Sequence, residues 1–198
     1  MAARPREFDT DQVLDAAMDA FWKRGYEATS LADLMDATGL QKGSIYKAFG
    51  DKHQLFLQVL RRYLEGGFQT LTQLLDGSES PAAGIRQWLS QVGQMCDDSD
   101  DPRGCFAMNS VIELAPHDDQ VCGTLHEHFQ SVAGLVSRTV ERGQEIGEFR
   151  RDRSAQELTE FMMLFVGGIV SMSKCPMSDL KTDSSVDLIL SSISTPGS

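Results

Sequence analysis

Apolar side chains recur every three or four residues along most of this chain, and no stretch alternates apolar and polar residues over the length of a β-strand. This spacing gathers the apolar residues on one side of an α-helix, which must then pack against another helix. Gly, Pro and Ser residues interrupt this spacing and separate the predicted helices. Five of these helices cover residues 10–24, 31–37, 41–49, 155–173 and 183–192. Three longer ones run from 52 to the break at 77–81, between that break and the acidic stretch 97–104, and from 117 to 144. The predicted fold class is all-α.

Two short helices separated by Gly39 form the most specific pattern in the sequence. Two helices joined by a short turn that contains glycine are typical of a DNA-binding helix-turn-helix. Glycine can adopt the positive φ that lets the second helix fold across the first. The side chains expected to close a three-helix core with the preceding helix are Val13, Phe21, Leu34, Leu40, Ile45 and Phe49.

The opposite side of the second short helix is left for a partner. Gln41 and Lys42 can donate to base edges, and Lys47 can reach bases or phosphates. Gly43 has no side chain and would let the helix approach the duplex closely, while the Tyr46 hydroxyl could reach a phosphate. The predicted DNA-contacting residues are Arg4, Arg6, Thr29, Ser30, Gln41, Lys42, Gly43, Ser44, Tyr46, Lys47 and Lys52.

The remaining members of this set lie near chain or helix starts. Thr29, Ser30 and Lys52 are close to predicted helix N-termini, where backbone N–H groups and the positive end of the helix dipole favour a phosphate. Arg4 and Arg6 precede the first helix and could reach the DNA backbone or the minor groove. A glycine-containing helical hairpin also occurs in helical proteins without a DNA role, and three lysines can be a solvated face. On the residues alone, that alternative stays open.

Charge and cysteine usage narrow the class of protein further. The formal net charge is −11, and the acidic excess follows residue 65, which argues against a protein that coats nucleic acid. The four cysteines form no CxxC pair and have no histidines at zinc-finger spacing, so we expect no metal, disulfide framework or cofactor. No apolar run reaches the roughly 20 residues of a membrane span, and the first residues lack a secretory apolar stretch, so we expect a cytoplasmic protein without a membrane partner.

The stretch GYEATSLADLMDATGLQKGSIYKAFGDKHQLF, residues 25–56, resembles the N-terminal domain of the TetR family of bacterial transcriptional regulators. The matching positions are Gly25, Tyr26, Thr29, Ser30, Thr38, Gly39, Gly43, Ile45, Tyr46, Phe49 and Lys52. The resemblance implies that Thr29, Tyr46 and Lys52 contact phosphates and that the second short helix faces the major groove. Gln41 departs from the commonest pattern, since a Ser or Thr usually caps that helix and Gln is a poorer cap.

A second copy of the chain is an expected partner. One short recognition helix buries little surface, so useful affinity requires two copies on a two-fold operator. The helix over 155–173 is apolar around most of its circumference, so one face should meet the second copy, although it could instead be central within a monomer. The predicted dimer-interface residues are Leu158, Val166, Gly167, Ile169, Val170, Val186, Ile189 and Ile193. The chain would then divide into a DNA-binding domain, residues 1–52, and a helical effector-binding and dimerisation domain, residues 53–198.

An unknown small-molecule effector is the third expected partner. Helical bundles form pockets where large, adaptable side chains meet, although such sets are often ordinary core. The predicted ligand-binding residues are Trp88, Met95, Cys105, Met108, Asn109, Phe129, Phe161, Met162 and Phe165, with Asn109 as the polar anchor. We therefore predict a dimeric transcriptional regulator, a repressor released from a palindromic operator by a mainly apolar effector. Alternatives are a helical enzyme or carrier, and a structural dimer that recruits a protein through its acidic face.

Overall fold

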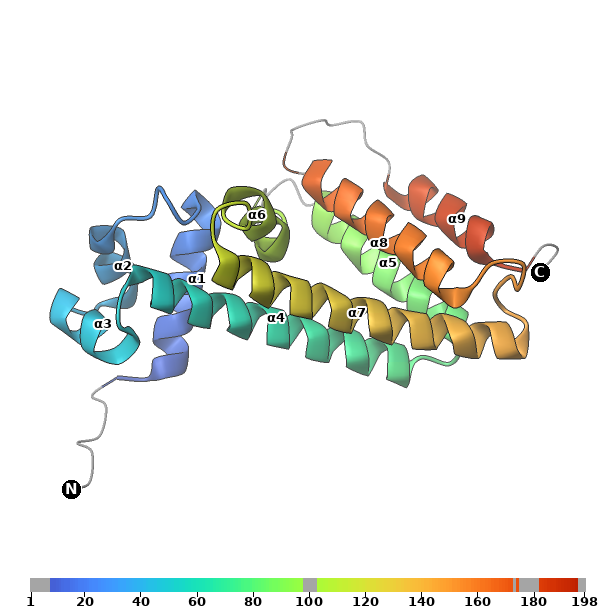
Figure 1. Cartoon of the computed structure of the whole chain (residues 1–198), viewed down its shortest axis with the longest axis horizontal. Helices are drawn as coiled ribbons and strands as arrows, with labels where there is room; N and C mark the ends of the chain where they lie inside the picture. The colour runs from blue at the N-terminus through green and yellow to red at the C-terminus, as the bar shows by residue number, and fades with distance from the viewer. Residues whose placement is uncertain (1–7, 98–102, 173, 175–181, 196–198) are drawn as a thin grey trace, which may run out of the picture.

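The structure is a computed structural model that describes residues 8–97, 103–172, 174 and 182–195. Over these ranges the chain forms nine α-helices and no β-strand, so the all-α prediction is confirmed. The helices are α1 Thr10–Arg24, α2 Leu31–Thr38, α3 Lys42–Phe49, α4 Lys52–Gly77, α5 Pro81–Asp97, α6 Phe106–Glu113, α7 Asp119–Ile146, α8 Ala155–Met172 and α9 Thr182–Ile193 (Figure 1). None of them is long and apolar enough to cross a membrane.

The molecule is elongated, with α1, α2 and α3 gathered at one end (Figure 1). We call these three helices the reading head. The long helices α4 and α7 run side by side away from it, and α5, α8 and α9 lie at the opposite end. We call α5, α7, α8 and α9 the body, which α4 and α6 join to the reading head.

Local signals set the ends of the first two helices. Asp9 caps α1 by accepting hydrogen bonds from two backbone amides, and Gly25, at a φ of 84°, ends it. Ser30 and Asp33 form a reciprocal capping box at the start of α2. Gly39 ends α2 in the left-handed conformation, with a φ of 68°, as the turn requires.

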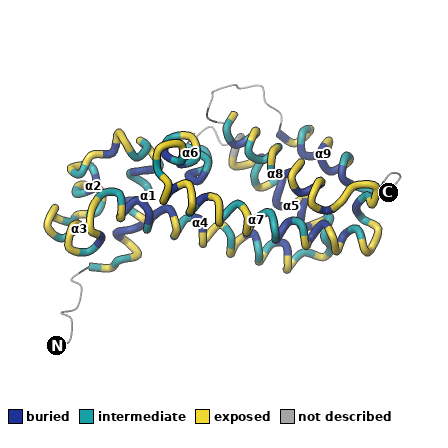
Figure 2. Tube along the Cα trace, viewed as in Figure 1, coloured by how far each residue is buried: buried dark blue, intermediate teal, exposed yellow. Residues whose placement is uncertain are grey.

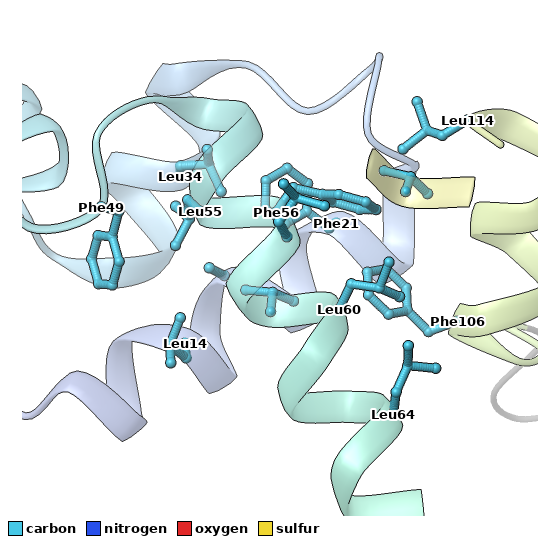
Figure 3. Close-up of a cluster of buried hydrophobic side chains, with 14 of the residues drawn as sticks. Leu14, Phe21, Leu34, Phe49, Leu55, Phe56, Leu60, Leu64, Phe106 and Leu114 are labelled. Atoms are coloured by element: carbon cyan, nitrogen blue, oxygen red, sulfur yellow. The ribbon is translucent and has the colours of Figure 1, made fainter. Parts of the chain in front are cut away.

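Two hydrophobic clusters hold the chain together. The head cluster joins α1, α2 and α3 to the first half of α4, to α6 and to the start of α7 (Figure 3). Five of the six predicted core residues are buried in it, and the sixth, Leu40, packs against it partly buried. The body cluster joins the second half of α4 to α5, α7, α8 and α9. Because α4 has Leu64 in the head cluster and Leu71 in the body cluster, it is a continuous link between the two ends (Figure 2).

Helix α6 is absent from the sequence prediction. Phe106, Ala107, Ser110 and Leu114 are buried along one side of this segment, a helical spacing in only eight helical residues. The short length and the neighbouring acidic stretch obscured the pattern. Residues 98–102 of that stretch lie outside the described residues.

Candidate nucleic-acid interface

The outer face of α3 is exposed and carries basic and aromatic side chains. Gln41, Lys42 and Lys47 are exposed, and Tyr46 keeps 43 % of its accessible surface. Ile45, on the opposite side, is fully buried in the head cluster. The structure therefore brings these four predicted contact residues together on the surface of one helix.

The first turn of α3 is open as well. A Cβ on Gly43 would point into open space, with no atom of the other described residues within 4 Å apart from the nearby backbone of α3 itself, and the following Ser44 is half-buried. Gln41 makes no side-chain capping hydrogen bond, as expected of a residue that caps helices less well than Ser or Thr. No acidic residue occupies this turn. The N–H groups at this end of α3 are thus not neutralised by a carboxylate of the helix itself.

Aromatic rings orient two of the lysines. The Nζ of Lys42 lies 5.6 Å from the centre of the Tyr46 ring, and the Nζ of the half-buried Lys52 lies 4.3 Å from that of Tyr26. Such cation–π contacts position an ammonium group without cancelling its charge. Arg62, by contrast, is held in ion pairs with two aspartates of α1. The lysines of α3 and of the start of α4 therefore remain able to meet phosphates.

The N-terminus of α2 differs from the phosphate site that the sequence suggested. Ser30 is exposed, but its hydroxyl donates to Asp33 at 2.6 Å and accepts from the Asp33 amide. Hydrogen bonds from the Ser30 hydroxyl and amide, together with Arg24, hold the pKa of Asp33 below its ordinary value. This end of α2 therefore already carries an anion. A contact between Ser30 and DNA stays a prediction.

The Thr29 side chain points inward, and a contact between Thr29 and a phosphate stays a prediction. Thr29 is fully buried, and its hydroxyl donates to the carbonyl oxygen of Gly25 at 2.6 Å. The residue thus fastens the turn between α1 and α2 from inside. Arg4 and Arg6 lie outside the described residues.

The structure divides the predicted effector residues between the two hydrophobic clusters. Trp88 and Met162 are buried in the body cluster with Phe165 packed against it, whereas Cys105 and Phe129 pack against the head cluster. Met95 and Phe161 are 39 % and 47 % exposed, and their contact with an effector stays a prediction. The half-buried Met108 and Asn109 lie on α6, between the two clusters.

A hollow that the sequence did not indicate lies between α4 and α7. Its volume is about 520 Å³, and none of the predicted effector residues lines it. Its walls are Arg61, Leu64, Glu65, Phe68, Asp119, Gln120, Gly123, Thr124, Glu127, His128 and Ser131. Burial lowers the pKa of His128, which favours a neutral ring there.

Most of the predicted dimer-interface residues face the chain's own core. The following are buried and unavailable to a partner: Leu158, Val170, Val186, Ile189 and Ile193. These five side chains pack inside the chain itself, whereas Val166, Gly167 and Ile169 are half-buried, and the dimer interface stays a prediction.

A helix-turn-helix head with an exposed basic helix, mounted on a helical body, defines a DNA-binding regulatory protein. Two family models match the chain: "Bacterial regulatory proteins, tetR family" over residues 13–59, and "Tetracyclin repressor-like, C-terminal domain" over residues 81–185. The chain belongs to the TetR family and is a transcriptional regulator. The family consists of regulators rather than enzymes, as predicted. The proposed boundary between residues 52 and 53 stays a prediction.

Named relatives and a solved structure agree with this assignment. The chain is 32 % identical over 167 residues to the HTH-type transcriptional repressor ComR of Escherichia coli K12, covering 84 % of this chain and 80 % of ComR. It is 26 % identical over 162 residues to the HTH-type transcriptional repressor DhaR of Mycobacterium sp. strain GP1, covering 81 % and 80 %. A cysteine variant of the TetR family regulator CifR, complexed with 26 bp of operator DNA, has a TM-score of 0.80 at 30 % identity over 94 % of this chain and 98 % of CifR.

Proposed function

We propose that the protein is a dimeric repressor that reads a two-fold symmetric operator through α3 and is released by a small, mainly apolar effector. The observation that carries this proposal is the outer face of α3, where Lys42, Tyr46 and Lys47 surround the open backbone at Gly43. In a chain with a net charge of −11, this small basic surface attracts phosphates while the body repels them.

The relatives support repression and the DNA target. ComR and DhaR are named transcriptional repressors, and the CifR variant was solved on operator DNA. A regulator of this kind acts where the bacterial chromosome is, so we infer a cytoplasmic location.

Exposed apolar side chains on α8 and α9 support a dimer. Phe161, Leu164, Gly168 and Met172 are exposed at helical spacing along α8, and Leu164 keeps 78 % of its accessible surface. Leu188 of α9 is 68 % exposed. An apolar stripe of this kind marks a binding surface, and a two-fold axis would set it against the same stripe of a second copy. The half-buried Val166 and Ile169 remain proposed interface residues beside it.

The side chain of Asn109 supports an effector-binding site beside α6. Its Nδ2 donates to the carbonyl of Arg103 at 2.9 Å, but its Oδ1 is buried and has no hydrogen-bond partner among the described residues. An unpaired buried acceptor is costly, and a donor group on an otherwise apolar ligand would satisfy it. Such a ligand changes the separation of the two reading heads in the dimer only to the extent that it binds the separated arrangement more tightly than the DNA-bound one.

The test is a double variant, Lys42→Ala with Tyr46→Ala, assayed by fluorescence anisotropy on the DNA upstream of its own gene. Loss of two contacts worth about 1 kcal/mol each in both subunits weakens the dimer by about 4 kcal/mol, or roughly 1,000-fold. Arg86→Ala, an exposed charge on α5, is the matched control and should bind like the wild type. Circular dichroism should show that all three proteins are folded. Wild-type affinity in the folded double variant would refute the proposal.

A further inference from the structure

Helix α6 and the residues beside it contact the reading head at both ends of the helix. Before α6, the carbonyl of Gly104 accepts a hydrogen bond from Trp22 Nε1 at 3.0 Å, and Arg103 pairs with Asp19 of α1 at 2.7 Å. At the end of α6, Glu113 reaches the turn that follows α1. Figure 1 shows α6 beside that end of α1. The position of α6 is therefore tied to the position of the reading head.

The Glu113 contact is the most specific of these. One carboxylate oxygen accepts from the backbone N–H of Tyr26 at 3.0 Å, and the other accepts from that of Glu27 at 2.9 Å. Hydrogen bonds to an ionised group are among the strong ones, and a two-pronged contact also fixes direction. Because both donors are backbone groups, Glu113 holds the course of the chain between α1 and α2.

The turn is shaped to admit this carboxylate. A Cβ on Gly25 would lie 2.9 Å from one Glu113 oxygen, and the φ of Gly25 is 84°, a conformation that favours glycine. Thr29 fastens the same turn from inside through its bond to the Gly25 carbonyl. The α1–α2 turn is therefore held from one side by its own residues and from the other by α6.

Asp118 makes a second carboxylate contact close to that of Glu113. Asp118, the N-cap of α7, lies 2.6 Å from the Nε2 of His53 in the first turn of α4, just beyond the recognition helix. Burial alone would raise the pKa of Asp118, but the Val121 amide, the His53 ring and the Gln120 amide outweigh burial and lower it. The turn between α6 and α7 thus contacts the reading head and the start of α4 with two carboxylates.

Helix α6 also contacts the body. Met108 lies near Gly167 of α8, and α6 packs against α7 and α8. A shift of α6 relative to α8 would therefore pull on Glu113, and through it on the turn that carries α2 and α3.

We infer that Glu113 is a positioning residue that sets the orientation of the reading head on the body, and so the separation of the two recognition helices in the dimer. This inference rests on the proposed function, because separation has meaning only for two copies on one operator. Glu113 contacts the turn after α1 rather than the outer face of α3, so it acts through backbone geometry and not by touching DNA.

The test measures spacing preference. An operator is first selected from a random DNA pool with the wild-type protein, and its half-sites are then moved apart or together by one base pair. Each step changes their separation by about 3.4 Å and their rotation by about a tenth of a turn. The ratio of affinities for the best and the neighbouring spacing should fall by about fivefold or more in Glu113→Ala.

The controls separate positioning from simple stability. Glu148→Ala removes a similar carboxylate bond, to the Ala82 amide at 2.8 Å, but in the body, and should leave the spacing ratio unchanged. Glu113→Gln keeps one acceptor oxygen and should show an intermediate ratio. If Glu113→Ala does not fold, the ratio in Glu113→Gln tests the inference instead. A uniform loss of affinity across all spacings, or an unchanged ratio in folded Glu113 variants, would overturn the inference. Failure of the wild type to select any two-fold site would instead refute the proposed function.

Discussion

Replacing Gly43 by alanine should separate the stability of α3 from its function. Gly43 lies in the first turn of α3, and apart from the nearby backbone of α3 no described residue lies within 4 Å of the new methyl position. Alanine is favoured over glycine inside a helix by about 0.5–1 kcal/mol, so the free protein should be slightly more stable. For a chain of this size, that gain corresponds to a rise in Tm of about 1–4 °C.

The same methyl group should weaken operator binding. The open backbone at Gly43 lies among the side chains proposed to meet DNA, so a methyl group there would hold α3 away from the groove. Loss of about 1 kcal/mol of base contact in each subunit predicts a Kd about 30-fold higher for the dimer. Differential scanning fluorimetry and fluorescence anisotropy on the selected operator measure the two effects.

Gly66→Ala on α4 is the matched control. Gly66 is an exposed helical glycine, and no atom lies within 4 Å of its Cβ position either. It should show the gain in Tm without the loss of affinity. If Gly43→Ala binds the operator as tightly as Gly66→Ala does, the surface of α3 around Gly43 does not meet DNA.

Three further predictions address the interface, the core and the pH dependence of stability. Leu164→Asp should turn the dimer into a monomer in sedimentation velocity, whereas Ile146→Asp, which changes a 65 % exposed side chain outside the stripe, should not; an intact Leu164→Asp dimer would contradict the interface. Gly143→Ala should cost about 1–3 kcal/mol in urea unfolding, because its Cβ would overlap the buried ring of Phe149; an unchanged midpoint would contradict that packing. The lowered pKa of Asp118 means that the unfolded chain binds more protons near and below about pH 4, so stability falls as pH falls there. Asp118→Asn keeps a capping residue and should reduce the loss of stability at acid pH. If the variant and the wild type lose stability equally as the pH falls, Asp118 does not contribute to this pH dependence.

Local signals made the reading head predictable. The observed bounds of α1, Thr10–Arg24, are the predicted ones, because Asp9 and Gly25 mark its ends within a few residues of sequence. The inward and outward sides of α3 follow from helical spacing alone. The inward direction of the Thr29 hydroxyl could not be predicted, because proximity to a helix start does not reveal whether a hydroxyl points outward or donates to a carbonyl behind it.

The dimer face could not be deduced from periodicity. Helix α8 is apolar on nearly every side, so its composition shows that it is covered but not which side the chain itself covers. The structure buries Leu158 and Val170 and exposes Leu164. In α9, Val186 and Ile189 are taken by the body cluster, which leaves Leu188 outward.

Long-range polar contacts were beyond sequence reasoning for another reason. Glu113 is one of 29 acidic residues, and its two amide donors lie 86 and 87 positions away. Only the packing of α6 beside α1 brings them together. The missed helix α6 and the missed Glu113 contact therefore have one cause, because both depend on how the segment around residues 103–118 packs in the tertiary structure.

The salt dependence of operator binding tests most directly whether α3 docks on DNA in two copies. Plotting log Kd against log salt concentration gives the number of phosphates that the protein neutralises. Lys47→Ala should reduce the magnitude of that slope by about 2, one phosphate contact in each of two subunits, while Arg138→Ala, on the exposed side of α7, should leave it unchanged. A slope in Lys47→Ala equal to that of the wild type would contradict the docking of α3 on the operator.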